Sequence, residues 1–428
     1  MGALAIYRAV TGIAGPLVRL YLRRRLARGK EDPSRLAERH GVASAPRPDG
    51  PLVWVHAASV GEAQSVLSLV GRLLNSRDDV TVLVTSGTVT SASLMARRLP
   101  ARALHQYAPA DLAGWVRRFL AHWRPQLALF VESELWPNLI CETAASLCPM
   151  IVVNGRMSAR SFARWKRTPA TARALLARFA LCLGQTAEDR DRFAALGAPR
   201  TDYVGNLKYS AAPLPASETD LAQLQDVVAG RPLWLAASTH PGEEELAAAA
   251  HETLTEDFPD VLTIIVPRHP ARGDEIEAML TSRGLNVCRR STGRLPRPDD
   301  AVYLADTLGE LGLFYRLAGI AFIGGSTGTL GGHNPLEAAQ LSCAILYGPD
   351  MANFRTVAAD LEAAEAALPV ADANTLATAV ARLLGDAAAR QRLANGARKV
   401  NAANAAALDN VVAALAPFID ALPAQQGG

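Results

Sequence analysis

Two glutamates follow strand-like apolar segments and are placed for acid–base chemistry. Glu62 ends the sequence HAASVGE after the apolar run 52–55, and Glu132 directly follows the run 127–131. Open α/β sheets bind ligands at the carboxyl ends of their strands, so we expect both carboxylates at that edge. One can accept a proton while the other binds or orients a sugar. The alternative for Glu62 is a helix N-terminal charge that complements the dipole, which is the role we predict for Glu134.

Two cations follow the same logic. Lys208 lies in GNLKY at the junction of the two halves of the chain, and Arg268 directly follows the apolar run 261–266. A guanidinium offers two parallel donors and suits a phosphate group. Either cation taken singly could also form a surface ion pair. Their position at the ends of predicted elements favours an anionic ligand.

A glycine-rich segment, AFIGGSTGTLGGHNPLEAA at 321–339, is predicted to form a strand, a loop and a helix that opens at Asn334-Pro335. Free backbone amides and the positive end of the helix dipole are expected to face an anion there, and Glu337 is expected to accept hydrogen bonds from a ribose. The segment 306–311 supplies a second loop and helix start. A plain strand-to-helix turn is the alternative.

Several classes of protein are excluded by composition and by missing motifs. The chain has 428 residues, is 50% hydrophobic and carries a net charge of +3, which does not indicate a nucleic-acid partner. It contains no GxGxxG after its first strand, no GxxxxGK[ST] loop and no HExxH. Its five cysteines form no CxxC pair, which indicates reduced thiols. The DxD at 189–191 lies in a helical pattern and is interpreted as solvated helix surface. No metal site is predicted.

Strands and helices alternate from residue 52 onward. We expect strands at 52–55, 80–84, 127–131, 150–153 and 181–183, and again at 233–237, 261–266, 301–304, 320–323 and 344–346. Helical patterns such as 63–74 and 136–147 lie between them. Continuous apolar strands separated by helices predict parallel sheets covered on both faces. The fold class is therefore α/β, with two doubly wound Rossmann-like domains and a cleft between them.

The domain boundaries follow from a proline-containing linker and from the two ends of the chain. The segment 211–215, AAPLP, separates a first domain at 31–210 from a second at 216–428. The tail from 374 is alanine-rich and is expected to form two helices, the last of which can return to the first domain.

The segment 1–30 carries a membrane signal. Its apolar part, 3–22, is followed at once by Arg23, Arg24, Arg25, Arg28 and Lys30, the reverse of the order in a secretory signal. Pro16 interrupts the middle, and Arg8, Gly12, Gly15, Arg19 and Arg23 fall on one helical face. We therefore expect a helix lying in the membrane interface, with a helix packed on its own domain as the alternative.

Eight motifs in order resemble one family. They are HAASVGE at 56–62, ESELWPNL at 132–139, NGRMSARS at 154–161, GNLKY at 205–209, STHPGEE at 238–244, VPRHP at 266–270, DTLGEL at 306–311 and GGHNPLEAA at 331–339. Together they resemble the 3-deoxy-D-manno-octulosonic acid (Kdo) transferases of lipopolysaccharide biosynthesis. The resemblance covers nearly the whole chain.

The resemblance implies a GT-B glycosyltransferase that moves Kdo with inversion from CMP-Kdo to the lipid A precursor, lipid IVA, at the cytoplasmic face of the cell inner membrane. It implies Glu62 as the proton acceptor, and Glu132 and Lys208 as stabilisers of the transition state. It also implies that the CMP of the donor contacts Pro267, Arg268, Leu308, Gly309, Glu310, Asn334, Pro335, Leu336 and Glu337. No cofactor or metal is expected, and no oligomeric state is predicted.

The sequence departs from the family pattern at Thr327-Gly328-Thr329-Leu330, where a Glu-Arg pair commonly precedes the glycines, and more mildly at Asn154-Gly155-Arg156-Met157. Two other functions stay open. One is a GT-B transferase that uses a different nucleotide sugar on a lipid acceptor. The other is a non-catalytic, membrane-bound nucleotide-sugar sensor.

Overall fold

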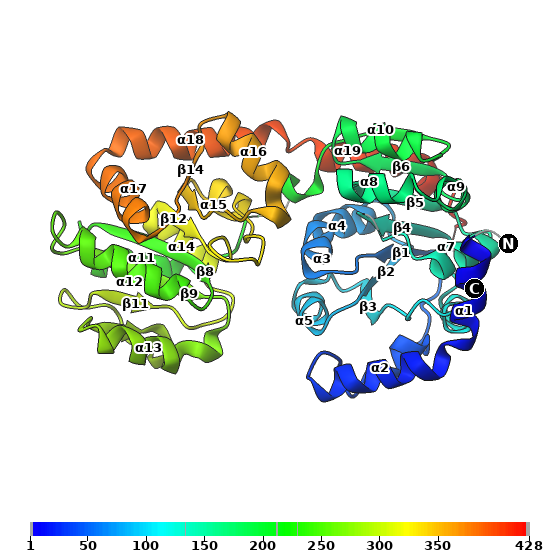
Figure 1. The fold of residues 1–428 in the computed structure, drawn as a ribbon, viewed down its shortest axis with the longest axis horizontal. Coiled ribbons are helices and arrows are strands. Elements are labelled where there is room, and N and C mark those ends of the chain that lie inside the picture. The colour runs from blue at the N-terminus through cyan, green and yellow to red at the C-terminus, as the bar shows by residue number, and fades with distance from the viewer. Residues whose placement is uncertain (1–2, 133, 211–212, 229, 425–428) are drawn as a thin grey trace. The chain divides into compact units, whose positions relative to one another are not determined.

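The chain forms two compact units (Figure 1). The structure is a computed structural model that describes residues 3–132, 134–210, 213–228 and 230–424. Unit 1 comprises 1–211 together with 404–428, and unit 2 comprises 212–403. Part of the predicted linker, 211–212, lies outside the described residues.

Unit 1 is built on a seven-stranded parallel sheet. Its strands are β1 (Leu52–His56), β2 (Thr81–Ser86), β3 (Ala103–Tyr107), β4 (Leu127–Val131), β5 (Met150–Gly155), β6 (Leu181–Gly184) and β7 (Thr201–Tyr203). Their order is β3-β2-β1-β4-β5-β6-β7, so β1 and β4 lie at the centre. The polar segments that follow these two strands are therefore neighbours at one edge of the sheet.

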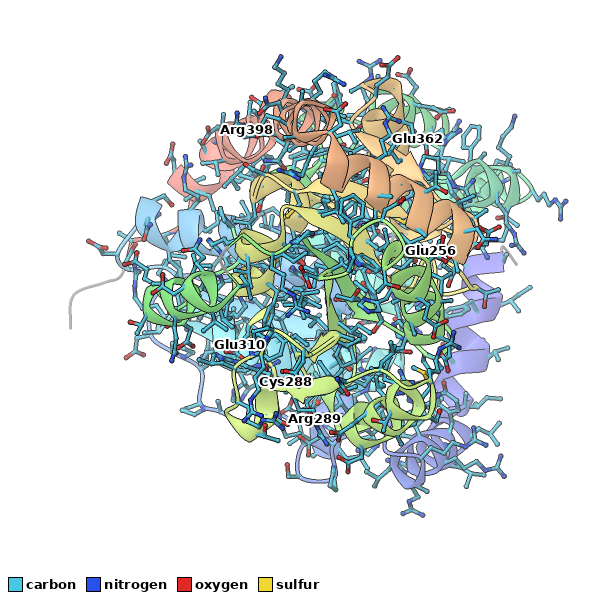
Figure 2. The ribbon with its side chains drawn as sticks, turned by 90° about the vertical axis from the view of Figure 1, so that its left-hand side faces the viewer. Glu256, Cys288, Arg289, Glu310, Glu362 and Arg398 are labelled. Atoms are coloured by element: carbon cyan, nitrogen blue, oxygen red, sulfur yellow. The ribbon has the colours of Figure 1, made fainter. Side chains whose placement is uncertain are left out.

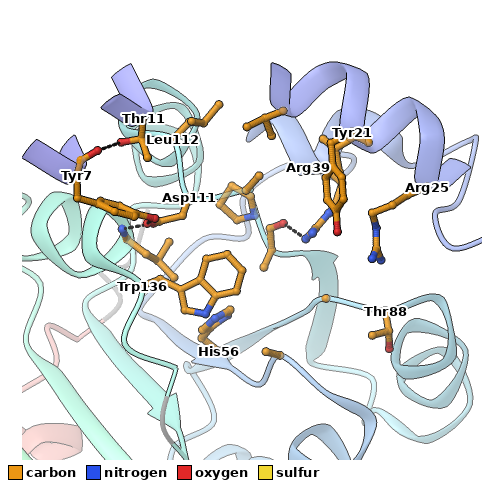
Figure 3. A pocket seen from close by; sticks show the side chains of 18 residues that line it. Tyr7, Thr11, Tyr21, Arg25, Arg39, His56, Thr88, Asp111, Leu112 and Trp136 are labelled. Carbon is orange, nitrogen blue, oxygen red and sulfur yellow. Dashed lines mark hydrogen bonds between the residues drawn. The ribbon is translucent and has the colours of Figure 1, made fainter. Parts of the chain in front are cut away.

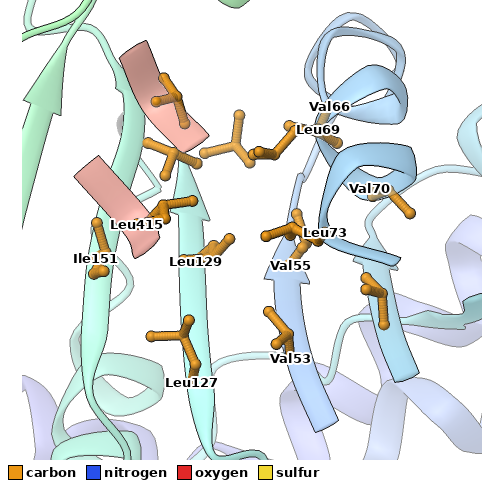
Figure 4. Close-up of a cluster of buried hydrophobic side chains, with 14 of the residues drawn as sticks. Val53, Val55, Val66, Leu69, Val70, Leu73, Leu127, Leu129, Ile151 and Leu415 are labelled. Atoms are coloured by element: carbon orange, nitrogen blue, oxygen red, sulfur yellow. The ribbon is translucent and has the colours of Figure 1, made fainter. Parts of the chain in front are cut away.

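Both faces of the central part of this sheet are buried, which is why β1 and β4 are almost continuously apolar. Val53 and Val55 point to one face, where α4 (Leu67–Ser76) and α19 (Ala407–Asp420) cover them (Figure 4). Leu52 and Trp54 point to the other face, under α6 (Ala113–Trp123), α7 (Pro137–Ala145) and α9 (Pro169–Leu176). The remaining helices of unit 1 are α3 (Val60–Ser65), α5 (Val89–Arg98), α8 (Ala159–Trp165) and α10 (Ala187–Ala195), with 3₁₀ turns η1 (Leu36–His40) and η2 (Leu207–Ser210).

Unit 2 repeats the architecture. Its strands are β8 (Leu233–Thr239), β9 (Leu262–Pro267), β10 (Val287–Arg289), β11 (Val302–Leu304), β12 (Ile320–Ile323), β13 (Ala344–Tyr347) and β14 (Ala367–Pro369), in the order β10-β11-β9-β8-β12-β13-β14. Its helices are α11 (Glu218–Val227), α12 (Glu243–Leu254), α13 (Gly273–Ser282), α14 (Leu311–Ala318), α15 (Leu336–Gln340), α16 (Arg355–Ala363), α17 (Ala373–Gly385) and α18 (Ala387–Ala403), with 3₁₀ turns η3 (Pro270–Arg272), η4 (Arg290–Thr292) and η5 (Ala352–Phe354). All the strand pairs in both sheets are parallel.

The ten predicted strands are confirmed, and the helices differ in two places. The helix expected at 63–74 is broken at Val66 into α3 and α4, and the tail forms three helices rather than two. The last of them, α19, packs in unit 1 against α4 and η2. Its apolar residues Val411 and Leu415 are buried in the core of the first sheet.

The N-terminal segment forms two helices, α1 (Ala3–Ile13) and α2 (Gly15–Ala27), bent by 69° where Pro16 interrupts the pattern. The expectation that five residues from Arg8 to Arg23 share one helical face is wrong, because the bend separates them. By length and hydropathy within the described residues, the stretch 387–420 could cross a membrane, and α1 with α2 passes the same test only as a bent pair. Because α19 packs in the core of unit 1, the apolar composition of the stretch 387–420 does not by itself indicate a membrane-spanning helix.

Polar contacts fasten α1 to unit 1. The Asp111 carboxylate accepts hydrogen bonds from the Tyr7 hydroxyl at 2.8 Å and from the backbone amides of Asn138 at 3.1 Å and Leu139 at 2.8 Å. Asn138 donates in turn to the Thr11 hydroxyl at 2.9 Å. Asp111 therefore satisfies the first turn of α7 and holds α1 against it.

Replacing Asp111 by alanine should lower the free energy of unfolding by about 2 to 4 kcal/mol, because two buried amides lose their only charged acceptor. Urea unfolding followed by tryptophan fluorescence would measure the change, since five of the six tryptophans lie in unit 1. Asp78→Ala, at a fully exposed carboxylate, is the control. Equal unfolding midpoints for the two variants would contradict this role.

Candidate active site

Glu62 lies at the start of α3, beyond the end of β1. Ser59 caps this helix, and the Glu62 carboxylate folds back to accept hydrogen bonds from the Ala58 amide at 2.9 Å and the Ser59 hydroxyl at 2.7 Å. This reciprocal capping is the alternative that the sequence offered, and it holds the carboxylate in one place. Glu62 is only 7% exposed. Burial, reinforced by the nearby charge of Glu132, raises the pKa of Glu62 to about 7.

Glu132 and Lys208 form an ion pair at the same edge of the sheet. Lys208 Nζ lies 3.1 Å from Glu132 Oε1, and both side chains are mostly buried. Glu132 ends β4 in a left-handed conformation with φ of 56°, and Asn154 at the end of β5 has φ of 52°. Asn154 Oδ1 accepts the Leu207 amide at 2.9 Å and so positions the turn that carries Lys208. Strained backbone of this kind clusters at functional sites.

Glu134 precedes α7, and its predicted role as a charge that complements the helix dipole stays a prediction. Its carboxylate accepts a hydrogen bond from the indole of Trp136, while Asp111 binds the first amides of α7. Burial raises the pKa of Glu134, and this charge contributes to the raised pKa of Glu62. The sequence interpretation missed Asp111, which lies 27 residues before the amide of Asn138.

In unit 2, the residues predicted to bind CMP follow three strands. Pro267 ends β9 and is buried, whereas Arg268 is exposed and anchored by its amide to the Thr239 carbonyl at 2.9 Å. Leu308 and Gly309 are exposed in the loop after β11, and Gly309 has φ of 90°. Glu310 is held by Arg290 at 2.6 Å (Figure 2 labels Glu310), so its carboxylate is oriented by protein contacts.

The glycine-rich loop differs from its prediction. The amides of Gly325, Ser326 and Thr327 do not stay free for an anion, because they donate to the Glu243 carboxylate at 2.7, 3.0 and 3.2 Å. Gly324 makes this approach possible, since a Cβ there would lie 2.5 Å from the Ser238 carbonyl oxygen. An internal carboxylate therefore occupies the anion-binding loop.

The segment after the glycines keeps its predicted position at the sheet edge. The helix α15 begins at Leu336, one residue later than expected, and Asn334 Oδ1 accepts the Leu336 amide at 3.1 Å. Pro335 and Leu336 are buried, while Asn334 and Glu337 are partly exposed. The helix start that was predicted to contact a ligand therefore belongs to a helix of only five residues.

Three histidines that sequence reasoning missed link the donor motifs. His240 follows β8, His269 follows β9, and His333 precedes Asn334. The rings of His240 and His333 stack with their Nε2 atoms 2.9 Å apart, and His269 meets His240 edge to face. Burial lowers the pKa of His333 to about 4, helped by the charge of Arg268. These ring contacts join the segments that carry Arg268 and Asn334.

No group of three or more histidine, cysteine or acidic side chains in the described ranges is arranged to hold a metal ion. The interpretation of 189–191 as solvated surface is wrong for Asp189. This residue is buried, and its carboxylate accepts the Met157 amide at 2.7 Å.

The structure thus groups the predicted residues by unit. Unit 1 brings Glu62, Glu132 and Lys208 together at the carboxyl edge of its sheet. Unit 2 places the predicted donor residues on loops after β9, β11 and β12 at the corresponding edge of its own sheet.

Comparisons with known proteins agree with this arrangement. A family model described as 3-deoxy-D-manno-octulosonic-acid transferase (kdotransferase) matches residues 34–211. A transferase of that name from Bordetella pertussis is 36% identical over 428 residues, which cover 96% of this chain and 98% of the relative. Another, from Rickettsia bellii, is 37% identical and covers 84% of this chain and 86% of the relative.

Solved structures confirm the two-domain α/β fold. A glycosyltransferase from Rickettsia africae superposes with a TM-score of 0.57 over 87% of this chain and 100% of its own, at 11% identity. Such low identity supports the GT-B-like fold alone. The similarity to the transferases is high and spans nearly their whole length, and the chain therefore belongs to the 3-deoxy-D-manno-octulosonic acid transferases, a family of glycosyltransferases.

Proposed function

We propose that the protein transfers Kdo from CMP-Kdo to the lipid A precursor, lipid IVA, with inversion at the anomeric carbon. Kdo transfer is supported by family membership. The observation that carries the mechanism is the buried carboxylate of Glu62, whose pKa of about 7 suits a base at neutral pH.

The reaction needs one proton transfer and one displacement. The acceptor hydroxyl oxygen bonds to the anomeric carbon of Kdo while its proton passes to the Glu62 carboxylate. The bond between that carbon and the phosphate oxygen breaks, and its electron pair leaves with CMP. Attack from the face opposite the leaving group inverts the anomeric centre.

Glu132 and Lys208 are proposed to stabilise the transition state. Their ion pair places a fixed ammonium group beside the base, where it can balance negative charge that develops on the donor. Because the pair is already formed and mostly buried, little reorganisation is needed during the reaction.

The donor is proposed to contact Pro267, Arg268, Leu308–Glu310 and Asn334–Glu337 through its CMP. Arg268 offers parallel donors to the phosphate, and the exposed turn at Gly309 offers backbone groups to the nucleotide. We propose that these groups act without a metal or other cofactor. The amides of Gly325 and Ser326 are not part of the proposed donor site, because they already donate hydrogen bonds to the Glu243 carboxylate.

Attachment to the cytoplasmic face of the inner membrane is proposed to occur through α1 and α2. Seven of the fourteen exposed large hydrophobic side chains in the described part of the chain lie on these helices, including Ile13 at 82% and Leu17 at 72% exposure. Exposed apolar patches of this kind mark interaction surfaces. Arg23, Arg24 and Arg28 are exposed on α2 and beside it, where anionic lipid headgroups would attract them.

Glu62→Gln should lower kcat by about 100-fold to 10,000-fold while leaving the affinity for CMP unchanged, because glutamine keeps the helix cap but cannot accept the proton. Mass spectrometry of the products formed from CMP-Kdo and lipid IVA would measure turnover. A competition binding assay of CMP against UDP would measure the affinity for the nucleotide. Glu218→Gln, at an exposed helix-start glutamate of unit 2, is the control. A variant that kept its turnover would rule out Glu62 as the base.

The pH profile of kcat/KM should show activity falling as the pH drops below about 7, because the base is lost when Glu62 is protonated. In Glu132→Gln the midpoint should move to lower pH, since one cause of the raised Glu62 pKa is removed. Rates of wild type and variant measured across the same buffers would test this. Identical midpoints would show that another group controls the profile.

The double variant Ile13→Asp, Leu17→Asp should lose binding to anionic vesicles by at least about tenfold, because two apolar side chains no longer enter the interface. Cosedimentation with vesicles would measure it. Leu147→Asp, at an exposed leucine outside these helices, is the matched control. Unchanged sedimentation of the double variant would argue against attachment through this surface.

A further inference from the structure

A cavity of about 460 Å³ lies in unit 1 between α1, α2 and the carboxyl ends of β1, β2 and β3 (Figure 3). Its size is that of a small-molecule site. It reaches Ala58, whose amide holds the Glu62 carboxylate, and Trp136, whose indole holds Glu134. The cavity therefore adjoins the proposed base.

One wall of the cavity carries excess positive charge. Arg25 Nε donates to Glu31 Oε1 at 2.6 Å, and Arg39 Nε lies 3.5 Å from Glu31 Oε2. Two guanidinium groups thus share one carboxylate. Asp111, an acidic side chain that lines the cavity, is engaged by Tyr7 and by the amides of α7. An anion in the cavity would complete the charge balance of the arginines.

A buried donor lies on the floor of the cavity. His56 is 2% exposed, and its Nε2 has no hydrogen-bond partner among the described residues. Its Nδ1 lies 2.9 Å from the Thr85 hydroxyl, which already accepts the Trp54 indole N–H at 2.8 Å. Thr85 can donate its own hydroxyl proton to Nδ1, and in that tautomer the ring proton lies on Nε2 as a donor to a ligand. Buried donors are rarely left unpaired unless a ligand completes them.

Apolar side chains also line the cavity, beside the hydroxyl-bearing Tyr7, Thr11, Tyr21 and Thr88. Val18 and Leu22 come from α2, Leu112 from the start of α6 and Leu139 from α7. The opposite surface of α2 carries the exposed leucines that we assign to the membrane. A ligand that enters from the bilayer would bring both an apolar part and a polar group to this cavity.

We infer that this cavity binds the phosphorylated sugar headgroup of the lipid acceptor, with a phosphate monoester facing Arg25, Arg39 and His56 and the first atoms of an acyl chain facing Val18 and Leu22. The inference rests on the proposed function, because it assumes that the acceptor is an anionic glycolipid. It makes α1 and α2 part of the acceptor site as well as a membrane contact. The cavity would place the sugar hydroxyl toward the loop that carries Glu62.

The test compares equilibrium binding of detergent-dispersed lipid IVA, without donor, before and after phosphatase treatment. Wild type should bind the phosphorylated lipid about tenfold or more tightly than the dephosphorylated one, as expected for hydrogen bonds to a charged group. Arg25→Gln and His56→Phe should each reduce this preference to within about twofold. His56→Phe keeps the ring packing beside Trp54 and Phe130, and Arg25→Gln serves if that core variant fails to fold.

Arg24→Gln is the matched control, because it removes an equal charge from an exposed position of the same helix outside the cavity. Equal losses in Arg24→Gln and Arg25→Gln would overturn the inference and assign the effect to general attraction to the lipid surface. Wild type that binds both lipids alike would also overturn it.

Transfer assays separate this inference from the proposed function. Wild type that prefers the phosphorylated lipid but transfers no Kdo to it would contradict the function and support the cavity as a lipid site. Wild type that transfers Kdo equally well to both lipids, with equal acceptor KM, would contradict the cavity and support the function.

Discussion

The interaction on which the site depends is the burial of the Glu62 carboxylate next to a second carboxylate at the edge of a sheet covered on both faces. Because the central strands β1 and β4 are almost continuously apolar, the candidate acidic side chains lie in the segments that follow them. β1 and β4 are adjacent, so the segments that carry Glu62 and Glu132 must meet. Lys208 compensates Glu132 directly, whereas Glu62 accepts hydrogen bonds from Ala58 and Ser59. This difference in partners is consistent with the different roles that we propose for the two glutamates.

The central strands could be predicted from the sequence because burial on both faces leaves a continuous apolar run. The four strands that the sequence did not reveal, β3, β7, β10 and β14, are the four edges of the two sheets. An edge strand is partly exposed and short, as in β7, where Asp202 and Tyr203 face solvent. Its residues therefore carry no run that distinguishes them from a loop. The break at Val66 was missed for a different reason, since the apolar spacing continues through it from Ala63 to Leu69.

The candidate catalytic glutamates could be predicted because they lie in the segments after recognisable strands, but the partners of other backbone groups could not. Glu243 lies 82 residues before Gly325, and only the pairing of β8 with β12 brings it to the glycine loop. A sequence pattern shows that a loop is rich in amides, but it does not show that an internal carboxylate already binds them. The same is true of Asp111, which accepts the amides of Asn138 and Leu139 at the start of α7. In both cases the residue that satisfies the backbone amides is distant in sequence, so a local sequence pattern could not identify it.

The N-terminal helices are also more than a separable anchor. A pure membrane anchor would need no polar contacts with the body of the enzyme, yet Tyr7 and Thr11 on α1 hydrogen-bond to Asp111 and Asn138. These contacts fix α1 and α2 beside the carboxyl edge of the sheet, where they line the cavity. In the proposed function, an acceptor whose acyl chains remain in the bilayer presents only its headgroup, which restricts the hydroxyls that reach Glu62. Since the helices proposed to contact the lipid surface also line this cavity, the proposed membrane attachment and the proposed choice of acceptor hydroxyl depend on one packing arrangement.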